Sequence, residues 1–138
     1  MVVVPVHDIE SSRFAAVCNY VEEHLAKEIT VADLADLVCL SATRFAHRFR
    51  MAYGVAPYRY ILLRRIARAK TLLRTTRSTI AVIATEVGFS SQSRFTDTFM
   101  RLVGMAPSLY RTLSVPGQLH IGELENSRLP RQIFPQLV

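Results

Sequence analysis

The sequence predicts an all-α protein made of two helix-turn-helix subdomains joined by one long helix. Three observations support this prediction. A stretch of the chain occurs twice, the segment 41–75 contains nine basic residues and no acidic one, and an amphipathic stretch of 19 residues, 57–75, separates the two copies. The duplication determines how the rest of the chain is divided.

The repeat relates residues 31–60 to residues 80–110. Small apolar residues occupy matching positions, and each copy continues with two phenylalanines, a glycine, a proline and a tyrosine. Paired residues lie 49 apart before the turn, as Leu34 and Ile83 do, and 50 apart after it, so one residue is inserted near 90–91. A duplicated supersecondary unit with such a shift is hard to produce by chance.

Each copy has the pattern of a helix, a tight turn and a second helix. In the first copy, Thr30 and Asp33 form a capping-box pattern at the start of a helix over 30–38. Its apolar residues then fall on one helical face. Ser41 follows the turn and can cap a second helix over 42–53.

The second copy repeats this pattern with helices over 79–87 and 91–103, Gly88 in the turn and Ser91 as the cap. A three- to four-residue turn between two helices is typical of the helix-turn-helix, whose second helix enters the DNA major groove. The alternative is a pair of helical hairpins that pack only on themselves. One copy alone leaves these two interpretations about equal.

The distribution of charge favours the DNA interpretation. Residues 1–40 carry a net charge of −5, whereas residues 41–75 carry +9 without a single acid, so the overall net charge of +6 understates the contrast. Like charges at this density repel each other, and a polyanion can compensate them. A solvated helix face would normally include acids that pair with the bases. Arginine predominates, which suits bidentate contacts with phosphate and guanine.

The stretch 57–75 is predicted to be a linker helix with Pro57 in its first turn. Its apolar stripe consists of Leu62, Ile66, Ala69 and Leu73. Four arginines point away from this stripe, namely Arg64, Arg65, Arg68 and Arg74. A helix of this length spans about 28 Å, close to the roughly 34 Å between successive major grooves on one DNA face. The two second helices are therefore expected in adjacent grooves, and the site should be asymmetric because the copies differ.

The residues from Phe14 to Leu113 resemble the DNA-binding region of the AraC/XylS family of transcription regulators, in particular its short stand-alone type. The most specific parts are 80–99 and 104–111. The resemblance implies two three-helix subdomains and a linker helix, seven helices in all. The implied helices span 12–25, 30–38, 42–53, 57–75, 79–87, 91–103 and 107–112.

The predicted organisation has five parts. They are an N-terminal tail over 1–11, a first subdomain over 12–56, the linker helix over 57–75, a second subdomain over 76–113 and a C-terminal tail over 114–138. Residues 1–10 are expected to be mobile. Pro116 and Gly117 end the helical pattern. The C-terminal tail still contains apolar residues, so it either packs on the second subdomain or meets a partner.

Helix geometry predicts which residues read bases. If Phe45, Phe49, Phe95 and Phe99 face the core, a second set of side chains on the same helices projects away from it. These candidate base readers are Thr43, Ala46, His47, Arg50, Gln92, Ser93, Arg94, Thr96 and Asp97. The resemblance implies a base-reading role for all of them except Arg50 and Thr96. Candidate phosphate contacts are Ser41, Arg44, Arg48, Arg64, Arg65, Ser91, Arg101 and Arg111.

Two candidate residues depart from the family pattern. Ala46 stands where the short members can use a longer polar side chain, and Asp97 stands where a basic residue often occurs. A carboxylate at that position repels phosphate, but it could accept a hydrogen bond from cytosine N4 or orient Arg94. The orienting role is the one favoured here.

Other chemistry finds no support in the sequence. The histidines are scattered without metal-ligand spacing, no nucleophile has a base and an orienting group at meaningful spacing, and no cofactor motif occurs. Cys18 and Cys39 are interpreted as small buried hydrophobic residues in a reduced cytoplasm. No apolar run is long enough to span a membrane, and no signal peptide is evident.

The sequence therefore predicts a cytoplasmic, non-enzymatic transcription regulator that binds double-stranded DNA as a monomer and contacts RNA polymerase. Family analogy favours activation over repression. The chain has no evident length for a sensing domain, so no small-molecule effector is expected. The alternative is a protein-interaction module with weak DNA binding, for which the acidic residues Glu22, Glu23 and Glu28 could supply a surface.

Overall fold

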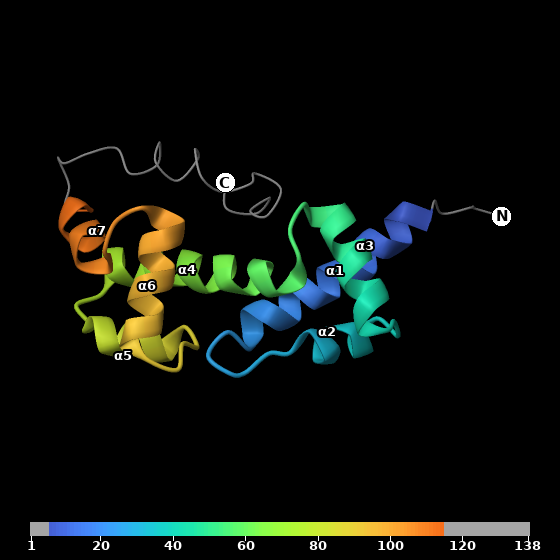
Figure 1. The fold of residues 1–138 in the computed structure, drawn as a ribbon, viewed down its shortest axis with the longest axis horizontal. Coiled ribbons are helices and arrows are strands. Elements are labelled where there is room, and N and C mark those ends of the chain that lie inside the picture. Colours follow the sequence, from blue (N-terminus) through green and yellow to red (C-terminus); the bar gives the residue numbers. More distant parts are fainter. Residues whose placement is uncertain (1–5, 115–138) are drawn as a thin grey trace. The chain divides into compact units, whose positions relative to one another are not determined.

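The computed structural model describes the backbone of residues 6–114 and the side chains from Ser12 to Ser114. Within this range all regular elements are α-helices, which confirms the predicted class (Figure 1). They are α1 (Val6–Glu23), α2 (Val31–Leu37), α3 (Ala42–Tyr53), α4 (Pro57–Thr75), α5 (Ile80–Glu86), α6 (Gln92–Val103) and α7 (Pro107–Leu113). None of the described helices combines the length and apolarity needed to cross a membrane.

The helix bounds agree closely with the predicted ones except in α1. The helices α3 and α4 have the predicted bounds, whereas α1 begins at Val6 instead of residue 12. The predicted N-terminal tail over 1–11 is therefore too long, because no glycine or proline interrupts the sequence from Val6 to Glu23. Residues 1–5 and the predicted C-terminal tail beyond Ser114 lie outside the described residues.

The described residues fall into two compact units that divide between Ile61 and Leu62, within α4. In the first unit, buried Phe14 of α1 contacts the rings of Phe45 and Phe49, with centroid distances of 5.9 and 5.8 Å. This aromatic contact holds α1 against α3.

The ring of Tyr53 stacks on the ring of Phe49, with their centroids 4.6 Å apart. Burial raises the pKa of the Tyr53 hydroxyl above its usual value, and a hydrogen bond with Cys18 adds to the rise.

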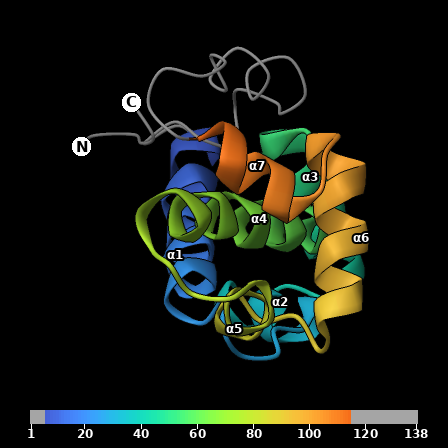
Figure 2. The same cartoon turned by 90° about the vertical axis from the view of Figure 1, so that its left-hand side faces the viewer.

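The core of the second unit draws on all four of its helices. Its buried residues are Ile66, Ala69 and Leu73 from α4, Ile83 and Ala84 from α5, Val87 after α5, Phe95 and Phe99 from α6, and Tyr110 from α7. Figure 2 looks nearly along α4 and shows α5, α6 and α7 around it. The predicted apolar stripe of α4 is thus buried, apart from half-buried Leu62.

Side-chain caps begin the paired helices as predicted. Thr30 Oγ1 accepts from the Asp33 N–H at 3.1 Å, and the Thr30 N–H donates to Asp33 Oδ2 at 3.3 Å, which completes the capping box. Ser41 accepts from the Arg44 N–H at the start of α3, and Ser91 accepts from the Arg94 N–H at the start of α6. The two second helices therefore begin in the same way.

The turn after α2 corrects the interpretation of Cys39. The Leu40 N–H donates to the Ala35 carbonyl and the Cys39 N–H to the Asp36 carbonyl, which is a Schellman motif. This motif places Cys39 in the left-handed region, with φ of 57°. Its side chain is exposed, so Cys39 is not the predicted buried hydrophobic residue. Cys18 is only half-buried.

The same motif ends α5, where Gly88 with φ of 90° takes the place of Cys39. Left-handed backbone is costly for residues with a Cβ and easy for glycine. We expect Cys39→Gly to be about 1 kcal/mol more stable than Cys39→Ala, and Gly88→Ala to destabilise the protein by about the same amount. Urea unfolding followed by circular dichroism measures these differences. Equal stability of the two Cys39 variants would show that the turn carries no such strain.

Candidate nucleic-acid interface

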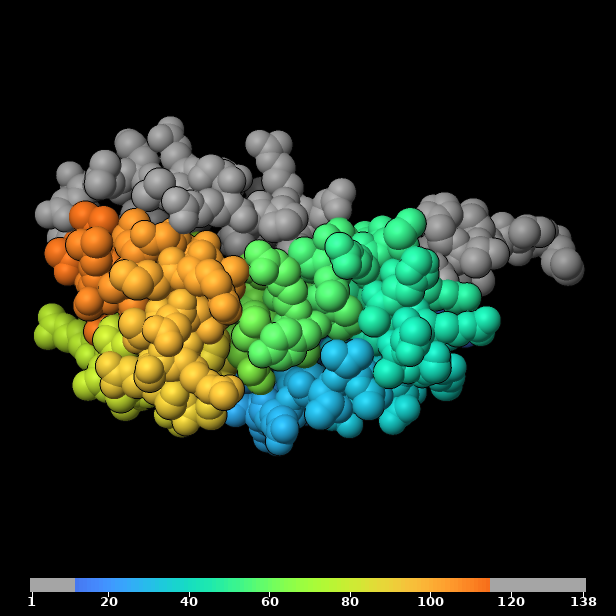
Figure 3. All heavy atoms as spheres, in the orientation of Figure 1, coloured from blue at the N-terminus to red at the C-terminus, as the bar shows by residue number. Residues whose placement is uncertain are grey.

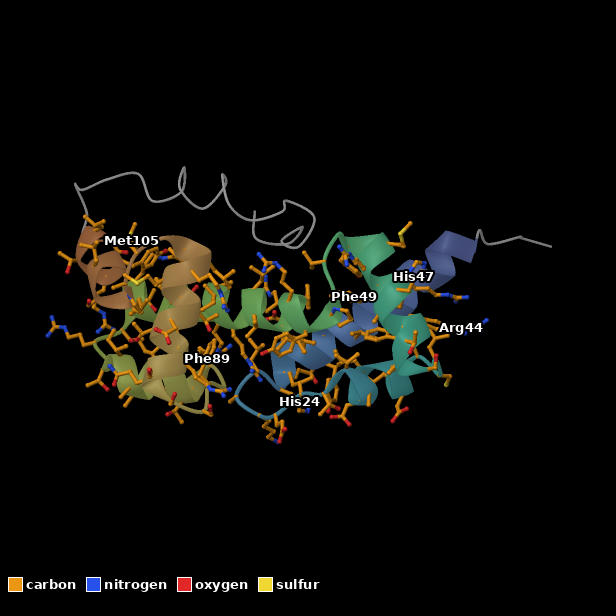
Figure 4. The ribbon with its side chains drawn as sticks, in the orientation of Figure 1. His24, Arg44, His47, Phe49, Phe89 and Met105 are labelled. Atoms are coloured by element: carbon orange, nitrogen blue, oxygen red, sulfur yellow. The ribbon has the colours of Figure 1, made fainter. Side chains whose placement is uncertain are left out.

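The outward face of α3 is polar and basic. Phe45 and Phe49 are fully buried, and His47 stands midway between them, so it points to the opposite side of the helix. Figure 4 shows Arg44 and His47 on the side of α3 that faces away from Phe49. Thr43, like these two, is exposed. The helix thus presents donors and cations from its first turn to its middle.

Two further predicted base readers on α3 differ in exposure. Arg50 is exposed, whereas Ala46 is half-buried and stands where the outward face meets the core side. A methyl side chain at that position offers only apolar contact, such as contact with a thymine methyl group.

The outward face of α6 has the same geometry. Phe95 and Phe99 are buried, and Asp97 stands midway between them on the opposite side. The three residues of its first turn, Gln92, Ser93 and Arg94, are exposed. Thr96, like Ala46, is half-buried. Side chains of α6 cover much of the visible face of the second unit (Figure 3).

The positions of α3 and α6 correspond one to one at a constant offset of 50. Both have 12 residues, both begin after a capping serine, and both end at a left-handed glycine, Gly54 with φ of 80° and Gly104 with φ of 93°. Arg44 and Arg94 therefore occupy the same position. From the sequence, Arg44 was predicted to contact phosphate and Arg94 to read a base. Equivalent positions of the repeat thus have different predicted roles.

Charge differs between the two faces. The face of α3 has no acid, whereas Asp97 is the one acid within α6. Among the described side chains, no hydrogen bond or ion pair joins Asp97 to Arg94. The contact expected of an orienting residue is thus not seen in the protein without DNA.

Several basic side chains of the second unit have partners within the protein. Arg111 donates from Nε to the Leu73 carbonyl at 3.2 Å and from Nη2 to the Thr76 carbonyl at 3.4 Å. These bonds satisfy carbonyls at the C-terminal end of α4. They give Arg111 a structural role that no local sequence pattern indicates, because the partners lie more than 30 residues apart in the chain.

Tyr110 interacts with two more basic side chains of the second unit. Arg74 Nη1 donates to the Tyr110 hydroxyl at 2.7 Å, and Nζ of buried Lys70 lies 5.9 Å from the centre of the Tyr110 ring. Arg74 was predicted only to point away from the apolar stripe. Of the linker residues predicted to contact phosphate, Arg64 and Arg65 are half-buried.

His24 of the first unit contacts Tyr20, one helical turn before it. Nδ1 of His24 donates to the Tyr20 carbonyl at 2.8 Å, and the two rings stack with their centroids 4.0 Å apart. No group of three or more potential metal ligands forms among the side chains from 12 to 114. His7 and His120 fall outside the described side chains.

Similarity to known proteins identifies the family of this helix-turn-helix domain. A family described as a helix-turn-helix domain matches residues 34–112. The probable transcriptional regulator LumQ of Photobacterium leiognathi is 36% identical over 103 residues, which cover 75% of this chain and 42% of LumQ. The chain belongs to the AraC family of helix-turn-helix domains.

Two further relatives place this AraC-type domain in context. The arabinose operon regulatory protein of Escherichia coli strain K12 is 37% identical over 106 residues, covering 76% of this chain and 36% of that protein. The DNA-binding domain of AdpA, solved in complex with a target DNA, has a TM-score of 0.70 and 31% identity and covers 72% of this chain and 90% of its own. The chain spans about two fifths of the length of the curated relatives named here.

Proposed function

We propose that this AraC-type chain is a transcription regulator that binds specific sequences in double-stranded DNA through α3 and α6. The observation that carries the proposal is that α3 and α6 share their length, a capping serine and two buried phenylalanines, so that matching positions such as His47 and Asp97 face outward. Helices of this kind read base edges in the major groove from their N-terminal residues. The solved complex of the AdpA domain with DNA supports the same use of the fold.

The candidate positions divide into two roles. Base readout falls to Thr43, Ala46, His47, Arg50, Gln92, Ser93, Arg94, Thr96 and Asp97. Phosphate contacts fall to Ser41, Arg44, Arg48, Arg64, Arg65, Ser91 and Arg101. We leave Arg111 out of this set because its guanidinium binds carbonyls of the chain itself.

The proposal assigns one half-site to each helix-turn-helix. Because the outward faces of α3 and α6 differ, the two half-sites differ and the full site is not a palindrome. One chain then carries both reading helices, so a monomer suffices. Following the family, we propose that the bound protein activates transcription and contacts RNA polymerase.

Selection of bound duplexes from a random DNA pool tests the proposal. We expect enrichment of one asymmetric sequence with two conserved blocks centred about one helical turn apart. A pool that stays random after repeated rounds would refute specific binding and favour the alternative of a protein-interaction module.

The base reader with the clearest expected effect is Arg94. Its replacement in Arg94→Ala should weaken binding of the selected site by about 1–3 kcal/mol and relax the preference at one base pair, because a bidentate guanine contact is lost. The matched control is Arg101→Ala on the same helix, which should weaken binding of selected and random duplexes alike. Titrations on both duplexes measure the difference. Equal losses on the two duplexes for Arg94→Ala would remove it from the base readers.

A further inference from the structure

Asp97 occupies the centre of the face that α6 presents for DNA. It is exposed and stands two residues from each of the buried residues Phe95 and Phe99. The constant offset makes it the counterpart of His47 in α3. A residue at this position meets base edges if α6 lies in the major groove, so the inference rests on the proposed function.

The protein itself supplies no described partner for this carboxylate. No hydrogen bond or ion pair of the Asp97 side chain occurs with any side chain or backbone group of the described part. Neither Arg94, one turn before it, nor Arg101, one turn after it, holds it in place. The orienting role that the sequence favoured therefore lacks its contact.

The surrounding charge makes the acid unusual. Between residues 62 and 114 the sequence has nine arginines and lysines but only two acids, Glu86 and Asp97. An ionised carboxylate close to the DNA phosphates is repelled, and it loses water when it enters the groove. Binding must supply a hydrogen-bond donor to offset both effects.

Base chemistry identifies that donor. An ionised carboxylate only accepts hydrogen bonds. Guanine presents two acceptors in the major groove, thymine an acceptor and a methyl group, and adenine a donor beside an acceptor, whereas cytosine presents the N4 donor alone. We propose that Asp97 reads a cytosine in the half-site bound by α6 by accepting from its N4 amino group, and that it thereby excludes the other three bases at that position.

Random-pool selections with three proteins test this proposal. The wild type and Glu86→Gln, which removes the other acid of the unit, should both enrich cytosine at one position of the second block. Asp97→Asn should change the preferred base at this position alone, from cytosine to adenine, because an amide can bond adenine N6 and N7 together. Titrations of the selected site and of a site with thymine there should show discrimination of about tenfold or more for the wild type, since one mismatched base pair in a specific site costs about that ratio or more.

The outcomes distinguish failure of the cytosine-reading role of Asp97 from failure of sequence-specific DNA binding. If Asp97→Asn enriches the same base as the wild type at every position, Asp97 does not read a base, while sequence-specific binding stands. If the wild type enriches no sequence, the proposed function itself fails, and the role of Asp97 fails with it. Both substitutions are nearly isosteric and lie at exposed positions, and circular dichroism checks that the helices are retained.

Discussion

Insertion of five base pairs between the two half-sites should lower the affinity by about 100-fold or more, to the affinity for a single half-site. Two linked binding units bind a double site at least about 100-fold more tightly than one unit binds its half-site. Five base pairs turn the second half-site by about half a helical turn, to the other side of the duplex. The helix α4 is continuous from Pro57 to Thr75, and a continuous helix cannot follow such a rotation if it stays intact on DNA.

Insertion of ten base pairs tests the spacing of the half-sites separately from their rotation. It restores the original side of the duplex but adds about 34 Å between the half-sites. The 19 residues of α4 extend about 28 Å in all, so affinity should stay low. Gel-shift titrations of the three duplexes measure the effect. Unchanged affinity after the five-base-pair insertion would mean that only one unit reads DNA or that the connection bends freely.

Raising the salt concentration from 50 to 200 mM should weaken binding by about 500-fold, because log K falls by about 0.9 per neutralised phosphate for each tenfold rise in salt. This factor assumes that five arginines each neutralise one phosphate, with Arg111 left out because it binds carbonyls of the chain. These are Arg44, Arg48, Arg64, Arg65 and Arg101. Fluorescence anisotropy across a salt series gives the slope, which should be about −4.5.

A pair of arginine variants checks the origin of this slope. The change Arg101→Gln should make the slope shallower by about 0.9, because one phosphate contact is lost. The change Arg77→Gln removes another exposed cation, one that is not assigned to DNA, so it should leave the slope as it was. A wild-type slope near zero would exclude neutralisation of several phosphates and would favour the protein-interaction module.

The sequence predicted best what local chemistry determines. The bounds of α3 and α4 and the caps at Thr30, Ser41 and Ser91 follow from residues within one helical turn of each other. The buried faces of these helices follow from the spacing of their apolar residues. Because burial on one side fixes exposure on the other, the candidate DNA-reading positions followed from the same pattern.

What the sequence missed depends on backbone geometry or on distant contacts. Cys39 has apolar neighbours, yet the Schellman turn after α2 leaves its side chain exposed. The start of α1 at Val6 was placed too late, although Pro5 directly precedes it in the sequence. The bonds of Arg111 to the end of α4 join residues 35 and 38 positions apart, which no local pattern reveals.

Binding of a selected site with each half-site scrambled in turn tests most directly whether both units read DNA. We expect each scramble to lower the affinity at least about tenfold, since each removes several base contacts worth about 1–3 kcal/mol apiece. Scrambling both should leave only salt-sensitive, non-specific binding. If one of the two scrambles leaves the affinity unchanged, only one helix-turn-helix reads sequence, and the matched faces of α3 and α6 do not share a function.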